Sequence, residues 1–235
     1  MASVPVMPCV VPMTACPWAV VLWDFDGTLS DTARDVWVSL DYAAERCGRR
    51  LSDELERSGE SLALSMQELF SWLVPPADPK LFGAFDADVT RHYRTLSPHE
   101  HTELFPGIRE LVFGLRAAGA SCRIVTNKPQ GALERILVLK GWAELFDGWE
   151  CSDSAGEGAL SKAQMMCHAL VSECVAPECC VMVGDSAGDV FGAHEAGMVS
   201  IGVTYGDGNV DELLAAGPDF VACDTRELRE ILLEG

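Results

Sequence analysis

Short runs of apolar residues alternate along this chain with segments in which apolar residues recur every three or four positions. The short runs are typical of buried strands, and the recurring positions are typical of helices that pack by one face. Strands that alternate with helices indicate a parallel sheet covered on both faces. The pattern therefore predicts an α/β fold with a doubly wound parallel sheet. The first predicted strand lies at the start of the segment 19–31, and the other four are 121–127, 148–152, 179–185 and 199–205.

One long region interrupts this alternation. Residues 33–104 contain no convincing strand, but they contain three stripes of apolar residues at helical spacing. The stripes are Val36, Leu40, Ala43 and Cys47; Leu62, Met66, Leu69 and Leu73; and Phe82, Phe85, Val89, Tyr93 and Leu96. Prolines in "VPPADP" (74–79) predict a turn between two of the helices. We therefore expect an N-terminal tail (1–17), a core domain (18–32 and 105–235) and an inserted all-helical domain (33–104).

Composition narrows the possible partners and the compartment. The chain has 235 residues and a net charge of −19, which repels nucleic acid and anionic membrane surfaces. Ten cysteines are scattered without a C-x-x-C pair, a usage that favours reduced thiols over a disulfide framework. The first 17 residues hold four prolines and no basic residue, unlike a secretory signal, and no apolar run approaches the ~20 residues that span a bilayer. We expect a cytoplasmic protein with no nucleic-acid or membrane partner.

Polar residues gather where the predicted strands end. These residues are Asp24 and Asp26; Thr126, Asn127 and Lys128; and Asp185 and Asp189, with Lys162 between the third and fourth strands. The carboxyl ends of parallel strands meet along one edge of a sheet, where ligands bind in such folds. Carboxylates buried there are costly unless a cation, a proton or hydrogen-bond donors hold them. The sequence thus predicts one site assembled from distant segments.

These segments resemble the haloacid dehalogenase (HAD) superfamily of phosphohydrolases, and within it the phosphoglycolate phosphatase-like group with a helical cap. The matching pieces are "DFDGT", "VTNK", Lys162, "VMVGDSAGDVFGAHEAGM" and "GVTYGDGNVDELLAAGPDFV". They cover most of residues 19–221, although the region 33–104 matches in pattern more than in sequence. The resemblance implies a Rossmann-like core with an inserted cap, and Mg²⁺-dependent chemistry on a small phosphate ester.

Phosphate esters need positive charge, positioned donors and a leaving-group acid for hydrolysis. By this resemblance Asp24 is the nucleophile that forms an aspartyl-phosphate, and Asp26 protonates the leaving alkoxide and later activates water. Alternate residues that leave a strand face the same side, so both carboxylates can reach one phosphorus. Lys162 would neutralise the charge that Asp24 shares with the phosphate. Relatives often have proline directly after that lysine, where this chain has Ala163, so a surface lysine is the alternative, with Lys128 as a weaker candidate for the role.

Magnesium would relieve the repulsion among the clustered carboxylates, because it prefers hard oxygen ligands. The resemblance assigns its ligands to the side chains of Asp24 and Asp185 and the backbone carbonyl of Asp26. Asp189 would act in the outer shell by orienting water or the lysine. The alternative for Asp189 is that it only caps the following helix.

Phosphate and substrate contacts are expected from two places. Thr126 and the following backbone N–H, that of Asn127, would bind the phosphoryl oxygens. In similar proteins a glycine-containing cap loop reaches the site; here that loop is 56–61, with Arg57 and Gly59. Arg57 is expected to meet a second anionic group of the substrate, the alternative being an arginine that is simply solvated. The H-x-H pair in "PHEH" (98–101) has no further zinc ligands nearby and is interpreted as a hinge.

Four other functions share these features to different degrees. Asp26 argues against a dehalogenase, which needs no leaving-group acid, and against a phosphonatase, which usually has a small residue there. A sugar-phosphate mutase keeps both aspartates and a similar cap, and a catalytically inactive binding module keeps the fold alone. We predict Mg²⁺-dependent hydrolysis of a small phosphate monoester similar to phosphoglycolate, by a monomer or homodimer, with the mutase and the binding module as alternatives.

Overall fold

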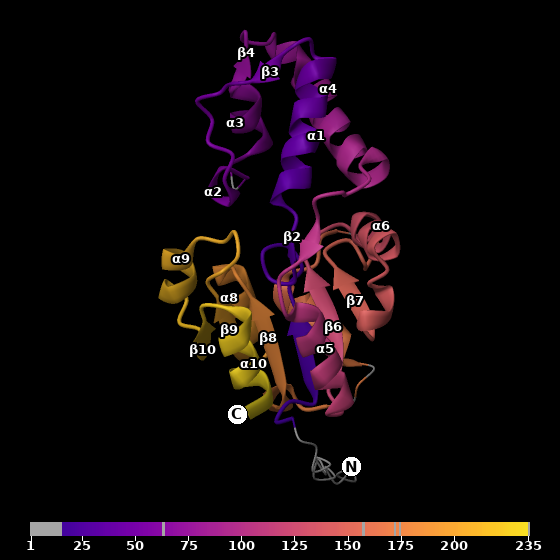
Figure 1. Cartoon of the computed structure of the whole chain (residues 1–235), viewed down its shortest axis with the longest axis vertical. Helices are drawn as coiled ribbons and strands as arrows, with labels where there is room; N and C mark the ends of the chain where they lie inside the picture. The colour runs from indigo at the N-terminus through magenta and orange to yellow at the C-terminus, as the bar shows by residue number, and fades with distance from the viewer. Residues whose placement is uncertain (1–15, 63, 157, 172, 174, 235) are drawn as a thin grey trace, which may run out of the picture.

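A six-stranded parallel sheet forms the centre of the larger part of the molecule (Figure 1). The structure is a computed structural model that describes residues 16–62, 64–156, 158–171, 173 and 175–234. In the order in which they pair, the strands are β10 (Phe220–Ala222), β9 (Val199–Val203), β8 (Cys180–Gly184), β1 (Val20–Trp23), β6 (Ser121–Thr126) and β7 (Gly148–Cys151). The predicted α/β class and the five predicted strands are confirmed. The expected N-terminal tail lies mostly outside the described residues.

Both faces of the sheet are buried, as expected for a doubly wound fold. Along β1, Val21 and Trp23 join one apolar cluster, whereas Val20 and Leu22 join another on the opposite face. Residues of α5 (Ile108–Ala117), α6 (Gln130–Lys140) and α10 (Thr225–Glu234) build the first cluster. Residues of α7 (Lys162–Val171) and α8 (Ala187–Glu195) build the second. The continuous apolar runs in the sequence follow from this double burial.

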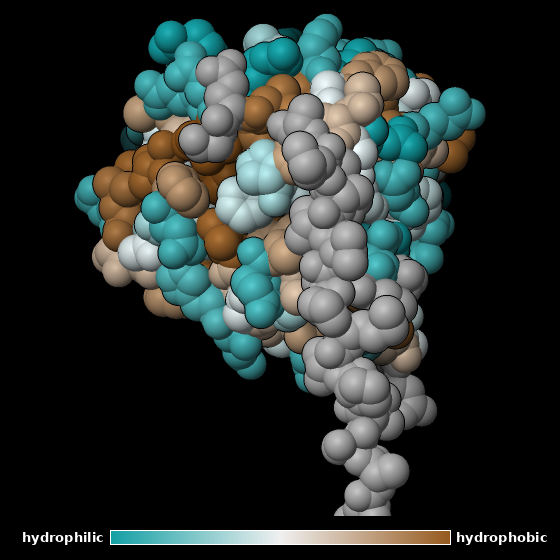
Figure 2. All heavy atoms as spheres, turned by 90° about the horizontal axis from the view of Figure 1, so that it is seen from below, coloured by the Kyte–Doolittle hydropathy of each residue, from teal (hydrophilic) through white to brown (hydrophobic). Residues whose placement is uncertain are grey.

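The sequence did not predict β10, at the edge of the sheet. Its three residues pair with β9 on one side, and Phe220 and Val221 are exposed. A short, partly exposed edge strand lacks the buried apolar run by which the other strands were identified. Figure 2 views the molecule from the end opposite the inserted region, and hydrophobic residues gather there toward the side on which β10 lies in Figure 1.

The inserted region forms a second body above the carboxyl ends of the strands (Figure 1). We call it the cap. It contains α1 (Ala33–Arg46), α2 (Gly59–Leu62), α3 (Met66–Ser71), α4 (Phe82–Arg91) and a π-helical continuation of α4, η2 (His92–Leu96), around an apolar cluster of its own.

The cap is helical as expected, but it differs from the sequence prediction in two respects. The second apolar stripe does not form one helix, because it is divided among α2, α3 and β4 (Leu73–Val74). In addition, β4 pairs antiparallel with β3 (Arg50–Leu51). Each of these strands has only two residues, too few for a periodic signal in the sequence.

Two chain crossings connect the cap to the sheet. β2 (Ser30–Asp31) and β5 (Glu103–Leu104) pair antiparallel at the crossing. The buried carboxylate of Asp35, in the first turn of α1, accepts hydrogen bonds from the His101 N–H (3.1 Å) and the Thr102 hydroxyl (2.6 Å). These contacts hold the outgoing and returning segments together. None of the described helices has the length and apolar character needed to cross a bilayer.

Candidate active site

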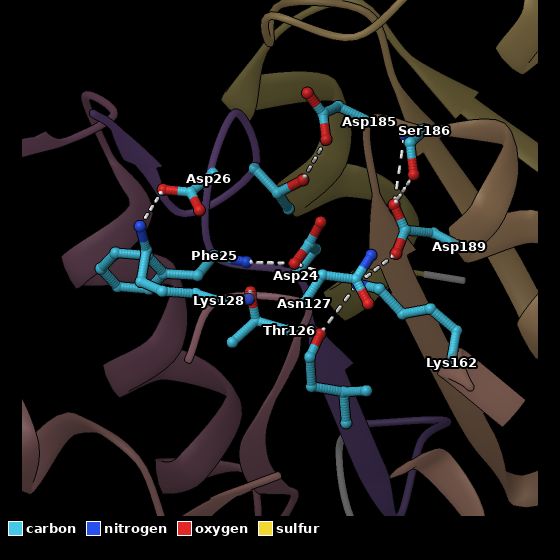
Figure 3. Close-up of polar contacts among 12 residues, drawn as sticks. Asp24, Phe25, Asp26, Thr126, Asn127, Lys128, Lys162, Asp185, Ser186 and Asp189 are labelled. Atoms are coloured by element: carbon cyan, nitrogen blue, oxygen red, sulfur yellow. Dashed lines mark hydrogen bonds and ion pairs between the residues drawn. The ribbon is translucent and has the colours of Figure 1, made fainter. Parts of the chain in front are cut away.

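Asp24 lies directly after β1, at the carboxyl edge of the sheet and beneath the cap (Figure 3). Its Oδ1 accepts a hydrogen bond from the Phe25 N–H (2.8 Å) and lies 3.0 Å from Nζ of Lys162. Both contacts use the same oxygen, so among the described groups Oδ2 is left to form a new bond. A carboxylate held in one orientation by a donor and a cation is suited to act as a nucleophile.

Lys162 opens α7 and is buried, so the surface alternative for this residue is wrong. Its ammonium group lies 2.7 Å from Oδ1 of Asp189 and donates to the Val125 carbonyl (3.1 Å), in addition to its contact with Asp24. Burial alone would lower the pKa of Lys162, but the carboxylates of Asp189 and Asp24 raise it above its ordinary value. The lysine therefore stays positively charged.

Asp189 has two partners, and each occupies one of its oxygens. Oδ1 faces Lys162, and Oδ2 accepts hydrogen bonds from the Ser186 hydroxyl (2.6 Å) and the Ser186 N–H (3.2 Å) at the start of α8. The predicted helix-capping role is thus present together with a contact to the lysine. This arrangement orients Lys162 toward Asp24.

Asp185 follows β8 and lies close to the loop that follows β1. Its Oδ1 accepts a hydrogen bond from the Thr28 hydroxyl (3.3 Å), and Oδ2 accepts one from the Gly208 N–H (2.9 Å). Gly27 has a positive φ of 72°, and a Cβ there would lie 2.0 Å from Oδ2 of Asp185. The glycine in "DFDGT" therefore allows the first loop to approach Asp185 closely.

Carboxylate oxygens of Asp24, Asp185 and Asp189 all lie within 4.8 Å of one another. Burial, followed by the charges of Asp189 and Asp26, raises the pKa of Asp24 to about 6 against the opposing effect of Lys162. Burial, followed by the charges of Asp24 and Asp189, raises the pKa of Asp185 to about 7. Hard oxygen ligands that repel one another in this way fit a divalent cation such as Mg²⁺.

Asp26 points away from the cluster of Asp24, Asp185 and Asp189, toward the ammonium group of Lys128 (Figure 3). Its Oδ1 accepts a hydrogen bond from the Thr32 hydroxyl (2.5 Å) and lies 2.9 Å from Nζ of Lys128. The buried ammonium group of Lys128 also donates to the Tyr93 hydroxyl of the cap (2.7 Å) and lies 4.7 Å from the centre of the Tyr93 ring. Lys128 therefore connects the carboxylate of Asp26 to the cap.

β6 and the position directly after it contribute two residues that differ in their exposure to solvent. Thr126 is buried, and its hydroxyl accepts a hydrogen bond from the Lys128 N–H (3.2 Å). Asn127 is exposed, and its backbone carbonyl accepts a hydrogen bond from the Ser152 hydroxyl (2.9 Å). Both occupy the expected edge of the sheet, and Asn127 also lines the space beneath the cap.

A cavity of about 520 Å³ lies between the sheet edge and the cap. Its wall combines polar groups from both parts with apolar side chains from the cap and α6. The lining residues are Asp26, Thr32, Ala33, Val36, Gly59, Leu62, Val89, Thr90, Tyr93, Arg94, Asn127, Lys128, Pro129, Ala132 and Asp207. A space of this size accommodates a small metabolite.

The loop 56–61 reaches the core through Gly59 but not through Arg57. A Cβ at Gly59 would lie 2.6 Å from Oδ1 of Asp207, so the absence of a side chain allows this contact. Arg57 instead forms two hydrogen bonds with Asp41 of α1 (2.6 and 2.7 Å) and lies over the ring of Trp37. It lines a separate, adjoining cavity of about 430 Å³.

Sequence reasoning missed several contacts of this site. It treated Lys128 only as a substitute for Lys162, and it did not single out Tyr93, Arg94 or Asp207. Tyr93 belongs to a predicted helical stripe and Arg94 follows it directly, but a stripe alone does not show which polar neighbours face a cavity. Asp207 follows the fifth predicted strand, so its position at a strand's carboxyl end was an available signal.

Sequence comparisons agree with this geometry. The sequence model of the haloacid dehalogenase-like hydrolase family matches residues 21–203. A phosphoglycolate phosphatase of Vibrio parahaemolyticus is 30% identical over 231 residues, which cover 94% of this chain and 98% of the relative. A 5'-nucleotidase of Pseudomonas aeruginosa is 29% identical over 221 residues, which cover 90% and 94% of the two chains.

Solved structures show the same fold. A haloacid dehalogenase-like family hydrolase from Streptococcus pneumoniae superposes with a TM-score of 0.73 at 24% identity, covering 90% of this chain and 97% of its own. The matched length includes the sheet and the cap together, so the two bodies occur in one chain in that structure as well.

Proposed function

The chain belongs to the haloacid dehalogenase-like hydrolase family, and from this premise we propose that it is a phosphatase that hydrolyses a small phosphate monoester through an aspartyl-phosphate on Asp24. The supporting observation is the position of Asp24: its side chain is only 14% exposed, and its carboxylate lies 3.0 Å from the ammonium group of Lys162 and borders two further aspartates. The names of the two relatives make phosphoglycolate and nucleoside monophosphates the first substrates to test.

In the first step, Oδ2 of Asp24 attacks phosphorus, and the bond from phosphorus to the leaving oxygen breaks. Asp26, in its protonated form, gives its proton to that oxygen, so the product alcohol leaves neutral. Lys162 compensates the negative charge that accumulates between Asp24 and the phosphoryl oxygens. Thr126 and the backbone N–H of Asn127 supply donors to the same oxygens.

In the second step, water attacks the phosphorus of the aspartyl-phosphate while Asp26, now ionised, accepts a proton from the water. The bond between Asp24 and phosphorus breaks, and inorganic phosphate is released. The ammonium group of Lys128 lies 2.9 Å from Oδ1 of Asp26 and holds this carboxyl group in place through both steps. The cap above the site limits the access of water during the first step.

The residues suited to hold Mg²⁺ are Asp24, Asp185 and the backbone carbonyl of Asp26. Asp189 fits an outer position, because its oxygens are occupied by Lys162 and Ser186. When bound, the cation supplies charge compensation for the phosphate and the carboxylates.

Phosphate release from a panel of esters tests this proposal. The panel contains phosphoglycolate, sugar phosphates and nucleoside monophosphates, each with and without Mg²⁺. Asp24→Asn should reduce release by at least about 1,000-fold, whereas Asp53→Asn, at an exposed aspartate that forms an ion pair with Arg50, should leave it unchanged. Release by Asp24→Asn at the native rate would contradict the proposal. Turnover only after addition of a sugar bisphosphate would indicate the mutase instead.

A further inference from the structure

Two positively charged side chains line the cavity beneath the cap, and their surroundings differ. Lys128 is buried and its charge is matched by Asp26 at 2.9 Å. Arg94 is exposed and forms no ion pair with any carboxylate in the described part of the chain. The guanidinium of Arg94 is therefore the cation on this wall whose charge is available to a ligand.

Arg57, the residue expected from the sequence to meet a second anion, is already engaged. Its two terminal nitrogens contact the two oxygens of Asp41, in the bidentate geometry that arginine forms with a carboxylate. It also lines the adjoining cavity and not the one that contains Asp26. Of the two cap arginines Arg57 and Arg94, only Arg94 therefore lines the cavity that contains Asp26.

The position of Arg94 is fixed relative to the reacting groups. Val89, Thr90, Tyr93 and Arg94 all line the cavity, and this spacing places them on one face of α4 and its continuation η2. The preceding residue, Tyr93, is tied to Lys128 (2.7 Å), and Lys128 is tied to Asp26 (2.9 Å). Arg94, which would contact the end of a substrate distant from Asp24, is thus connected through Tyr93 and Lys128 to Asp26, the proposed acid.

We propose that Arg94 determines specificity by binding a second anionic group, a carboxylate or a second phosphate, on the leaving part of the substrate. This inference rests on the proposed phosphatase function. The apolar side chains of Val36, Leu62 and Val89 would contact the carbon skeleton between the two anionic ends. Asp207 on the same wall repels an anion in its own part of the cavity, which favours the neighbourhood of Arg94 for the second group.

A matched pair of esters tests this proposal. Phosphoglycolate and ethyl phosphate differ by a carboxylate in place of a methyl group. Arg94→Gln should lower kcat/KM for phosphoglycolate by about tenfold or more, mainly through KM, as expected for the loss of a charge-assisted hydrogen bond. It should change kcat/KM for ethyl phosphate by less than about twofold, because that ester has no group for the arginine. Arg91→Gln removes an exposed arginine of α4 that does not line the cavity, and it should leave both values unchanged.

Binding of inert phosphonates separates this proposal from the proposed function. Calorimetry with Mg²⁺ would compare 3-phosphonopropionate and ethane-1,2-bisphosphonate with propylphosphonate, none of which can be hydrolysed. If a ligand with an anionic group at both ends binds more tightly than propylphosphonate, and this advantage disappears in Arg94→Gln, the result supports the inference even if no ester turns over. The tighter of the two doubly anionic ligands then shows whether Arg94 prefers a carboxylate or a second phosphate. A preference that is the same in the native protein and in Arg94→Gln, or that is lost equally in Arg91→Gln, overturns it.

Discussion

The sheet edge and the cap-facing wall of the same site are built differently. At the edge, the side chains of Asp24, Lys162 and Asp189 are largely buried, and Lys162 contacts both aspartates within 3.0 Å. On the cap side, Arg57 and Arg94 are exposed, and one of them is engaged by a partner within the cap. Buried charges need fixed partners, whereas exposed charges are stabilised by water and can exchange one partner for another.

This difference separates the chemistry from the choice of substrate. A charge that is held in place before the substrate arrives stabilises a transition state without reorganisation, which is the requirement for phosphoryl transfer. An exposed cation on a helix of the cap contacts only what the cavity admits. We therefore expect substitutions at the sheet edge to affect all substrates and substitutions in the cap to affect particular ones.

Lys162→Met should have the largest effect among the substitutions considered in this comparison. It removes the cation between Asp24 and Asp189 and should lower kcat/KM for every ester by about 100- to 1,000-fold, the usual cost of losing one stabilising group at a reaction centre. Lys80→Met, at an exposed lysine of the cap, is the matched control. Circular dichroism would establish that both variants fold. A loss confined to one substrate would contradict the proposed general role of the sheet edge.

The dependence of thermal stability on pH should reveal the cluster of Asp24, Asp185 and Asp189. The raised pKa values of Asp24 (about 6) and Asp185 (about 7) mean that the folded protein holds protons that the unfolded chain has already lost. Between about pH 4 and 7 these two groups therefore lower the free energy of unfolding as the pH rises. Mg²⁺ would bind the ionised carboxylates, so its stabilising effect should grow over the same window.

Thermal unfolding at two pH values measures this effect. Mg²⁺ at about 100 times its Kd should add about 2.7 kcal/mol at pH 7.5, a rise in Tm on the order of 5–10 °C for a chain of this size, and clearly less at pH 5. Asp185→Asn should remove most of the rise. An equal rise at both pH values, retained in Asp185→Asn, would place the cation elsewhere.

Much of the core was predictable because residues that directly follow the strands of a parallel sheet lie along the same edge of that sheet. Apolar runs identified five strands, and polar residues at their ends came together, as Asp24, Asp185 and Asp189 show. The missed strand, Phe220–Ala222, lacks two-sided burial. The cap was less predictable, since α2 and α3 are short and the residues by which the cap elements face one another depend on tertiary contacts. The pairing of Arg57 with Asp41, and the position of Arg94 on the cavity, follow from how α1 and α4 pack and from nothing local in the sequence.

Lys128 and Tyr93 join the two regions, and their variants sharpen the comparison. Lys128→Met leaves Asp26 without its ammonium partner and should lower kcat/KM by about 10- to 100-fold. Tyr93→Phe keeps the ring over the lysine and removes only the hydroxyl contact, so it should cost about two- to fivefold. Steady-state kinetics on two esters would measure both. A larger effect for Tyr93→Phe than for Lys128→Met would show that the cap contact matters more than the contact with Asp26.

Arg57→Gln should have the smallest effect. Its ion pair with Asp41 is exposed on both sides, with side-chain exposures of 49% and 37%, and such pairs contribute about 0–1 kcal/mol to stability. Because Arg57 lies outside the cavity that contains Asp26, the substitution should change kcat/KM for phosphoglycolate by less than about threefold, against about tenfold or more for Arg94→Gln. Measuring both variants with the same ester decides which cap arginine contacts the substrate. A large loss of kcat/KM for Arg57→Gln with none for Arg94→Gln would mean that Arg57 exchanges Asp41 for the substrate. The residue that binds the second anionic group would then be Arg57, as expected from the sequence, and not Arg94.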